Sequence, residues 1–335
     1  MRLFIKHFIT ATAAAAGLTG CGVVFEELEP CPQGVEMRFT YTRNLESANA
    51  FPAQVDCLTL HIFTADGNFV QTVTERSREK LGDENWRMNI ALAPGRYHAI
   101  AYGGIACEAA SFGHAVEPAA GFNYKDISMR LLDGQAGKQL HDHFHGSADF
   151  SIAPNSTDLT AVTLDMSKTV NHFRILLQET GNAPIDGRDF DVVITDRNDP
   201  LDHSNNSSAA GRTDYTAYSR GLITVSDSHN GKNRASGDNM VTVGFADLST
   251  SRLLTTTDAH LIITHRESGR TVMDIPLNTY LLMGKSGREA GWSDQEYLDR
   301  CSRWTLTFFL KSDLSWSQTR IVVNGWIVKL NDTEF

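Results

Sequence analysis

The sequence predicts an all-β protein with a few short helices. Apolar and polar residues alternate in many short runs, which is the spacing of strands that bury one face. Gly, Pro, Asn and Asp cluster between these runs, as turn residues do. Signals for the start of a helix are rare. Together these observations favour β-sandwich domains over any helical architecture.

The first half of the chain contains an isolated strand and two hairpins. Residues 34–41 place Val35, Met37 and Phe39 on one side, which predicts a half-buried strand. Residues 103–140 are rich in Gly, Ala and Ser, so we expect long loops there, around one short strand. The other elements expected in this half are a hairpin over 55–75, a second hairpin over 88–102, a short strand near 126–132 and a strand over 159–166.

A new series of strands begins near residues 165–168, which predicts a domain boundary there. The polar stretch 196–220 is expected to be an exposed loop. Ser293 and Glu296 have the spacing of a capping box and predict a helix that runs to Arg300. The strands expected in this half are 173–177, 190–194, 221–226, 240–245, a hairpin over 260–275, 304–311 and 321–330. Because the hairpins at 55–75 and 260–275 are alike, we expect two similar sandwiches in tandem, over 34–165 and 166–335.

The first 20 residues have the pattern of a bacterial lipoprotein signal peptide. A basic start is followed by an Ala-rich apolar run from Phe8 to Leu18, too short to cross a bilayer. Thr19 and Gly20 then precede Cys21, which matches the lipobox. We expect Cys21 to be lipidated and to begin the mature chain. The alternative is an ordinary secretory signal in which Cys21 plays no part.

Residues 21–33 are expected to form a lipidated tether. No Asp follows Cys21, so retention in an inner membrane is not indicated. The acidic residues Glu26, Glu27 and Glu29 resemble a surface-export signal, although a merely solvated tether explains them equally well. Several acyl chains on one terminus would hold the protein on a membrane almost permanently.

Composition limits the partners. The chain of 335 residues carries a formal net charge of -10 and has no run of Lys or Arg, which argues against nucleic acid as a partner.

Four cysteines follow Cys21: Cys31, Cys57, Cys107 and Cys301. An envelope location permits disulfides, but the sequence does not choose among the three full pairings, and buried free thiols are an equal alternative for two of them.

One histidine cluster suggests a metal. His141, His143 and His145 alternate, so an extended chain would place their imidazoles on one face, with His114 as a fourth candidate. No Cys or carboxylate framework accompanies them, and an ordinary strand explains them better. We therefore expect no metal and no other cofactor.

Enzymatic activity is not indicated. The sequence holds no nucleophile elbow of the Gly-x-Ser-x-Gly type and no phosphate-binding loop. Trp86, Trp292 and Trp316 could stack on sugars if they are exposed, but packing explains them more simply. Cys21 is thus the one residue expected to carry chemistry, and a surface glycan- or metal-binding lipoprotein is the competing functional class.

The chain resembles the Mfa2/FimB family of fimbrial anchor lipoproteins from Bacteroidales, from about Cys21 to Phe335. The order and spacing of several segments carry the resemblance: CPQGVEMRFTYTRN, QVDCLTLHIFTADGNFV, APGRYHAIAYGG, DMSKTVNHFRILL, QEYLDRCSRWTLTFFL and VVNGWIVKLNDTEF. The resemblance implies two transthyretin-like β-sandwiches. It also implies a lipid anchor in the outer membrane, exposure at the cell surface, and shaft and accessory subunits of a fimbrium as partners.

The implied role is structural: the protein would anchor the shaft and limit its length. Docking to shaft subunits would use β-strand complementation, in which a strand of one subunit fills a groove of another. We expect the terminal strand, 321–330, to take part in such an exchange. The alternative is that this strand only closes the second sandwich.

Overall fold

The computed structural model describes residues 33–154, 156, 158–226 and 240–329. The expected signal peptide, Cys21 and Cys31 lie outside the described residues. Within them the chain is mostly β-sheet, so the all-β prediction is confirmed. None of the described helices is long and apolar enough to cross a membrane.

Two sheets face each other in the N-terminal lobe, with the orders β4-β1-β9 and β10-β8-β5-β2-β3. Their facing sides bury Val35, Met37, Leu60 and Ile62 in one apolar core. The elements are β1 (Gly34–Thr40), α1 (Phe51–Gln54), β2 (Leu58–Thr64), β3 (Phe69–Glu75), α2 (Arg78–Leu81), β4 (Met88–Ala91), β5 (Gly95–Gly103), β8 (Phe144–Ile152), β9 (Thr160–Asp165) and β10 (Ser167–Lys168).

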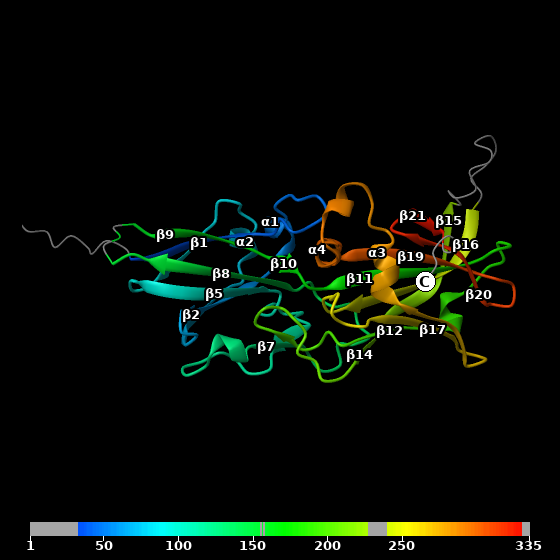
Figure 1. Cartoon of the computed structure of the whole chain (residues 1–335), viewed down its shortest axis with the longest axis horizontal. Coiled ribbons are helices and arrows are strands. Elements are labelled where there is room, and N and C mark those ends of the chain that lie inside the picture. Colours follow the sequence, from blue (N-terminus) through cyan, green and yellow to red (C-terminus); the bar gives the residue numbers. More distant parts are fainter. Residues whose placement is uncertain (1–32, 155, 157, 227–239, 330–335) are drawn as a thin grey trace, which may run out of the picture.

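The C-terminal lobe packs a six-stranded sheet, β15-β16-β11-β19-β20-β21, on a four-stranded sheet, β14-β12-β17-β18. Figure 1 shows the two lobes end to end along the long axis. The elements are β11 (Asn171–Glu179), η2 (Gly187–Asp189), β12 (Phe190–Asp196), β14 (Thr213–Thr216), β15 (Ser219–Ser226), β16 (Met240–Thr250), β17 (His260–His265), β18 (Arg270–Pro276), α3 (Leu277–Leu282), η3 (Gly287–Gly291), α4 (Asp294–Arg300), β19 (Arg303–Leu310), β20 (Trp316–Val323) and β21 (Trp326–Lys329).

A small third sheet, β13-β7-β6, joins the two lobes. It consists of β6 (Phe112–His114), β7 (Ser128–Leu131) and β13 (Leu201–Asp202), with η1 (Tyr124–Asp126) before β7. The short strand predicted near 126–132 is therefore confirmed as β7, and β6 was not predicted. Residues 105–142, which we call the cover, bury Phe112, Met129 and Leu131 in a core cluster that also contains Phe173 of the C-terminal lobe.

Both hairpins that looked alike in sequence are present, as β2–β3 and β17–β18. The predicted hairpin over 88–102 is wrong. Its two strands exist, but β4 pairs with β1 while β5 pairs with β2 and β8, so the chain crosses from one sheet to the other after Pro94. The reason is that Ile90 and Ala99 bury their side chains in the same core from opposite sides.

The exposed loop predicted over 196–220 is only partly right. Ser204, Asn206 and Ser208 are exposed, but the stretch also contains β13, β14 and the start of β15. Asn198 in this stretch is fully buried, accepts a hydrogen bond from the Tyr215 hydroxyl at 2.7 Å and donates one to the Arg252 carbonyl at 3.0 Å. A polar residue with such partners can be buried at little cost.

The helix predicted from Ser293 is confirmed as α4. The Ser293 hydroxyl accepts a hydrogen bond from the Glu296 amide at 3.1 Å, which is the serine half of a capping box. The Glu296 carboxylate instead accepts a bond from the Arg300 side chain, at 2.8 Å. The N-cap alone therefore suffices to begin this helix.

Candidate functional site

The open edges of the sheets are the first candidate for a docking site. The single strand predicted over 321–330 is wrong: β20 and β21 form a hairpin that turns at Asn324 and Gly325, whose φ angles are 48° and 86°. Two consecutive positive φ angles define a type I′ turn, which Asn-Gly favours. This dipeptide was the signal that sequence reasoning missed. Because β20 lies between β19 and β21 and buries Ile321 and Val323 completely, it cannot leave the sheet without opening the core.

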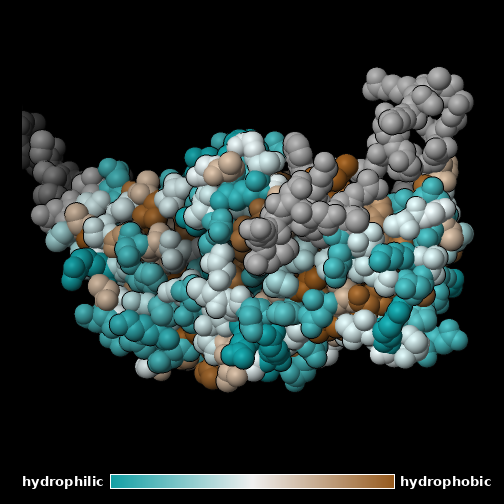
Figure 2. Space-filling model, turned by 45° about the vertical axis from the view of Figure 1, so that its right-hand side comes forward, coloured by the Kyte–Doolittle hydropathy of each residue, from teal (hydrophilic) through white to brown (hydrophobic). Residues whose placement is uncertain are grey.

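The edge strand β15 differs from the other edges of the C-terminal lobe. The strand holds no proline, and its one charged residue, Arg220, is paired with Asp191 at 2.9 Å, so residues 221–226 carry no charge. No described strand pairs with the outer side of β15. Leu222 is 46% exposed, and Met240 on the neighbouring β16 is 58% exposed. Figure 2 shows hydrophobic residues reaching the surface of this lobe among hydrophilic neighbours. An edge strand that is long and carries little charge can serve as a template for pairing with another chain.

The remaining edges of this lobe carry features that discourage pairing. The strand β18 contains Arg270 and Asp274 and ends at Pro276, and the short β14 contains Asp214. The strand β21 is four residues long and ends in Lys329, although Ile327 is 47% exposed. Charges, proline and shortness are the usual protections of an edge strand.

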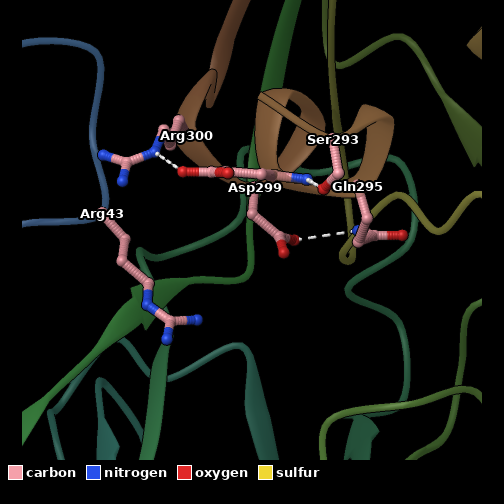
Figure 3. A pocket seen from close by; sticks show the side chains of 6 residues that line it. Arg43, Ser293, Gln295, Asp299 and Arg300 are labelled. Carbon is pink, nitrogen blue, oxygen red and sulfur yellow. Dashed lines mark hydrogen bonds and ion pairs between the residues drawn. The ribbon is translucent and has the colours of Figure 1, made fainter. Parts of the chain in front are cut away.

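The joint between the lobes is the second candidate. A cavity of about 380 Å³ lies between α4 and the segment that follows β1. Figure 3 shows Arg43 and Arg300 on its sides. The Arg300 guanidinium donates to the carbonyls of Thr42, at 3.3 Å, and Asn44, at 3.2 Å. It also lies over the Trp292 ring, 4.7 Å from its centroid. These contacts tie α4 to the end of β1.

A buried ion network reinforces the joint from another side. Asp142 accepts hydrogen bonds from Lys168 Nζ at 2.5 Å and from His172 Nε2 at 2.9 Å. Burial alone would raise the pKa of the Asp142 carboxyl, but the bonds from His172 and Lys168 outweigh it and lower that pKa to about 2. The Lys168 side chain is only 2% exposed, so its charge depends on Asp142.

A layer of histidines lies between the five-stranded sheet and the cover. His61 on β2 and His114 on β6 face each other with their Nε2 atoms 2.9 Å apart, and His61 Nδ1 lies 2.8 Å from the Thr72 hydroxyl. The Tyr102 ring is surrounded by four imidazoles, with ring centroids at 6.0, 5.1, 5.8 and 5.3 Å for His61, His114, His143 and His145.

Burial keeps these imidazoles neutral. It lowers the pKa of His61 to about 3, helped by His114, and the pKa of His114 to about 4. It also lowers the pKa of His143 to about 3 and that of His145 to about 4, although the hydrogen bond from His145 to the His203 carbonyl acts in the opposite direction. Four buried side-chain atoms of this layer have no hydrogen-bond partner among the described residues: Tyr102 Oη, His114 Nδ1, His143 Nε2 and His203 Nδ1.

The predicted histidine cluster is only partly assembled. His143 and His145 are buried near His114, whereas His141 is only half-buried, with its Nε2 3.9 Å from Asp56. No three or more His, Cys, Asp or Glu side chains of the described chain are placed to hold a metal ion. Sequence reasoning missed His61, which is 53 residues from its partner His114.

The cysteines of the described chain divide into one disulfide and one thiol. Cys57 and Cys107 are bonded and tie the start of β2 to the start of the cover. Cys301 is a buried thiol whose pKa burial raises to about 12, so it is not a reactive nucleophile.

The three tryptophans considered for sugar binding are engaged in packing. Trp86 stacks on Phe39 with centroids 6.2 Å apart, and Trp316 packs edge-on against Phe308 at 6.1 Å. Trp292 is covered by Arg300. Their packing leaves no shared aromatic platform on which a glycan could stack.

Comparisons with known proteins agree on one family. The family described as fimbrillin-A associated anchor proteins Mfa1 and Mfa2 matches residues 28–332. A candidate adhesin from Bacteroides thetaiotaomicron is 36% identical, with a TM-score of 0.82 over 91% of this chain and 100% of that chain. A candidate polysaccharide-binding protein from the same species is 26% identical, with a TM-score of 0.73 over 88% and 97% of the two chains.

The fimbrial anchor protein Mfa2 from Porphyromonas gingivalis has the same fold. It is 15% identical, with a TM-score of 0.65 over 90% of this chain and 100% of that chain. No curated protein matches the chain.

Proposed function

The chain belongs to the family of fimbrillin-A associated anchor proteins Mfa1 and Mfa2, and from this we propose that it anchors a fimbrium to the outer membrane and limits its length. In this proposal Cys21 carries the lipid, the shaft and accessory subunits are the protein partners, and the role is structural rather than enzymatic. The expected domain division at residue 166 is part of the same proposal.

The observation that supports anchoring is the direction of the chain through the molecule. The strand β1 begins at Gly34 and ends near Thr42 and Asn44, which contact Arg300 at the joint. The strand β1 therefore begins at the free end of the N-terminal lobe, away from the edges β15 and β21 (Figure 1). A lipid on Cys21 would hold this end at the membrane and direct the C-terminal lobe outward.

Shaft docking is best supported at the edge of β15. An added strand would pair with its outward-facing amides and carbonyls, and the exposed Leu222 would pack against alternate apolar residues of that strand. This differs from our expectation for 321–330, because β20 is interior and β21 is short. Since the lipidated end is held in the membrane, no further subunit could add beyond this chain, and its incorporation would end growth of the shaft.

A rigid joint suits this role. The Arg300 contacts, the Asp142 network and the core shared by both lobes link the membrane end to the docking edge. Force on the shaft would therefore pass through packed and hydrogen-bonded contacts rather than through a free linker.

The docking edge is tested by Leu222→Lys. We expect this substitution to reduce the shaft subunit that co-purifies with the protein by at least about tenfold, because a lysine would have to be desolvated against the added strand. Quantitative mass spectrometry of the material purified in mild detergent measures the ratio. Circular dichroism and the thermal midpoint should stay unchanged, because Leu222 contributes little to the core.

Val70→Lys is the matched control. Val70 is also an exposed apolar residue on an edge strand, β3, but it lies in the N-terminal lobe and is 38% exposed. The ratio of shaft subunit should not change in this variant. Two results would show that β15 is not the docking edge: an unchanged amount of shaft subunit with Leu222→Lys, or an equal loss of shaft subunit with both variants. The lipid anchor would then be tested separately.

A glycan-binding role is the weaker alternative. It is supported by the name of one structural relative, which is 26% identical. In this chain the three tryptophans that could serve a glycan are packed against Phe39, Arg300 and Phe308. We therefore place fimbrial anchoring first.

A further inference from the structure

We propose that the histidine layer is an acid-operated latch, which holds the cover closed while its imidazoles are neutral and releases it when they are protonated. The sheets beneath would stay folded, and the disulfide between Cys57 and Cys107 would keep the opened cover attached. This inference is independent of the role in a fimbrium.

The hydrogen bond between His61 and His114 is the contact that protonation would break. Two neutral imidazoles can share one proton across the 2.9 Å between their Nε2 atoms. When both rings are protonated, both Nε2 atoms carry hydrogen and neither can accept a bond. Two cationic donors then point at each other in a buried site, and the least costly response is for β6 to move away from β2.

The neighbouring groups reinforce this response. His143 Nδ1 contacts the Thr169 hydroxyl, while its Nε2 is buried without a partner, so protonation would add a donor that has no acceptor. No carboxylate of the described chain forms an ion pair with His61, His114 or His143. A charge gained by these three rings would therefore remain uncompensated.

The other titratable groups that face the layer are few and lie at its margin. From the sheet, His98 is paired with Asp149 at 2.7 Å and lies beside Tyr124 of the cover. In the C-terminal half of the chain, the charges of Arg252 and His203 lower the pKa of His145, whereas that of Asp202 raises it and so favours the protonated imidazole. Asp202 can thus ease the protonation of His145, but it has no such effect on the pair at β2 and β6.

The cover is held at its ends and in its middle. The disulfide at Cys107 and the start of β8 fix its ends. Between them, the Phe69 amide donates to the Phe122 carbonyl at 2.9 Å and the Tyr124 amide donates to the Gly67 carbonyl at 3.0 Å, so opening must break these bonds. Opening would also separate β7 from β13, which belongs to the C-terminal half of the chain. The latch would therefore loosen one of the links between the two halves.

The direction of the pH effect follows from the lowered pKa values. Unfolded histidines bind protons below about pH 6.5, whereas the closed layer binds them only near pH 3 to 4. The latch is fully effective above pH 6.5 and weakens as the pH falls toward 4. Each histidine that gains a proton on opening increases the opening constant about tenfold per pH unit.

Hydrogen exchange with mass spectrometry tests the latch in the intact chain with EDTA present. After correction for intrinsic exchange, we expect the opening constant of amides in β6 and β7 to rise about 100-fold or more between pH 6 and pH 5. Amides in β11 and β19 should change less than about threefold over the same range. An equal change in both regions, or no change in the cover, would overturn the proposal.

The double substitution His61→Gln and His114→Gln removes the titration while two amides can still hydrogen-bond. In this variant, the rise in the opening constant of the cover amides per pH unit should be about 100-fold smaller than in the unaltered protein. The control His265→Gln, on the exposed end of β17, should leave that rise unchanged. If the double variant does not fold, His145→Gln should make the rise in the opening constant per pH unit about tenfold smaller. Unaltered pH dependence in a folded variant would contradict the latch.

Discussion

Replacing Asp142 with asparagine is expected to lower the free energy of unfolding by about 3–5 kcal/mol. The substitution removes the anion that Lys168 and His172 share, and it leaves the Lys168 ammonium buried at the joint. Urea denaturation followed by circular dichroism measures the loss at pH 7. Because the pKa of Asp142 is lowered, the contribution of its charge is present above pH 4 and disappears as the pH falls through about 2.

Asp247→Asn is the matched control. Asp247 forms a bidentate pair with Arg174, but that arginine side chain is 51% exposed, so breaking the pair should cost about 1 kcal/mol or less. Adding Lys168→Met to Asp142→Asn should recover part of the loss, since no buried charge then remains. Equal costs for Asp142→Asn and Asp247→Asn would show that the joint does not depend on the buried pair.

Replacing Cys21 with alanine should move nearly all of the protein, and the fimbriae with it, from the outer membrane into the medium. The physical reason is that each buried methylene of an acyl chain contributes about 0.8 kcal/mol to membrane binding, and the variant would lack these chains. Immunoblots of membrane and medium fractions measure the change. Cys31→Ala, in the same segment of the chain, is the control and should leave the protein on the cell. Retention of Cys21→Ala on the membrane would contradict lipid anchoring.

Local patterns in the sequence were sufficient to predict most strands. The alternation of Val35, Met37 and Phe39 predicted β1, and the Ser293 cap predicted α4, because each signal depends only on near neighbours in the chain. The hairpins β2–β3 and β17–β18 were predicted for the same reason. The Asn324-Gly325 turn was equally local and should have been predicted.

Pairings between distant segments could not be predicted in this way. The alternation in β2 places His61 on the face opposite Leu60 and Ile62, which suggests exposure to solvent. His61 is 1% exposed because the cover, whose composition predicted loops, packs on that face. The same holds for 196–220, where Asn198 and Tyr215 satisfy each other across 17 residues. Such contacts depend on which segment lies over which sheet, and that information is not local.

The central claim, that this chain anchors a fimbrium, is tested most directly by purifying the lipidated protein from its own cells in mild detergent and identifying the proteins that accompany it. The account predicts a fimbrial shaft subunit in large molar excess, which should be lost with Leu222→Lys and kept with Val70→Lys. Recovery of a glycan or a transporter without any fimbrial subunit would contradict it.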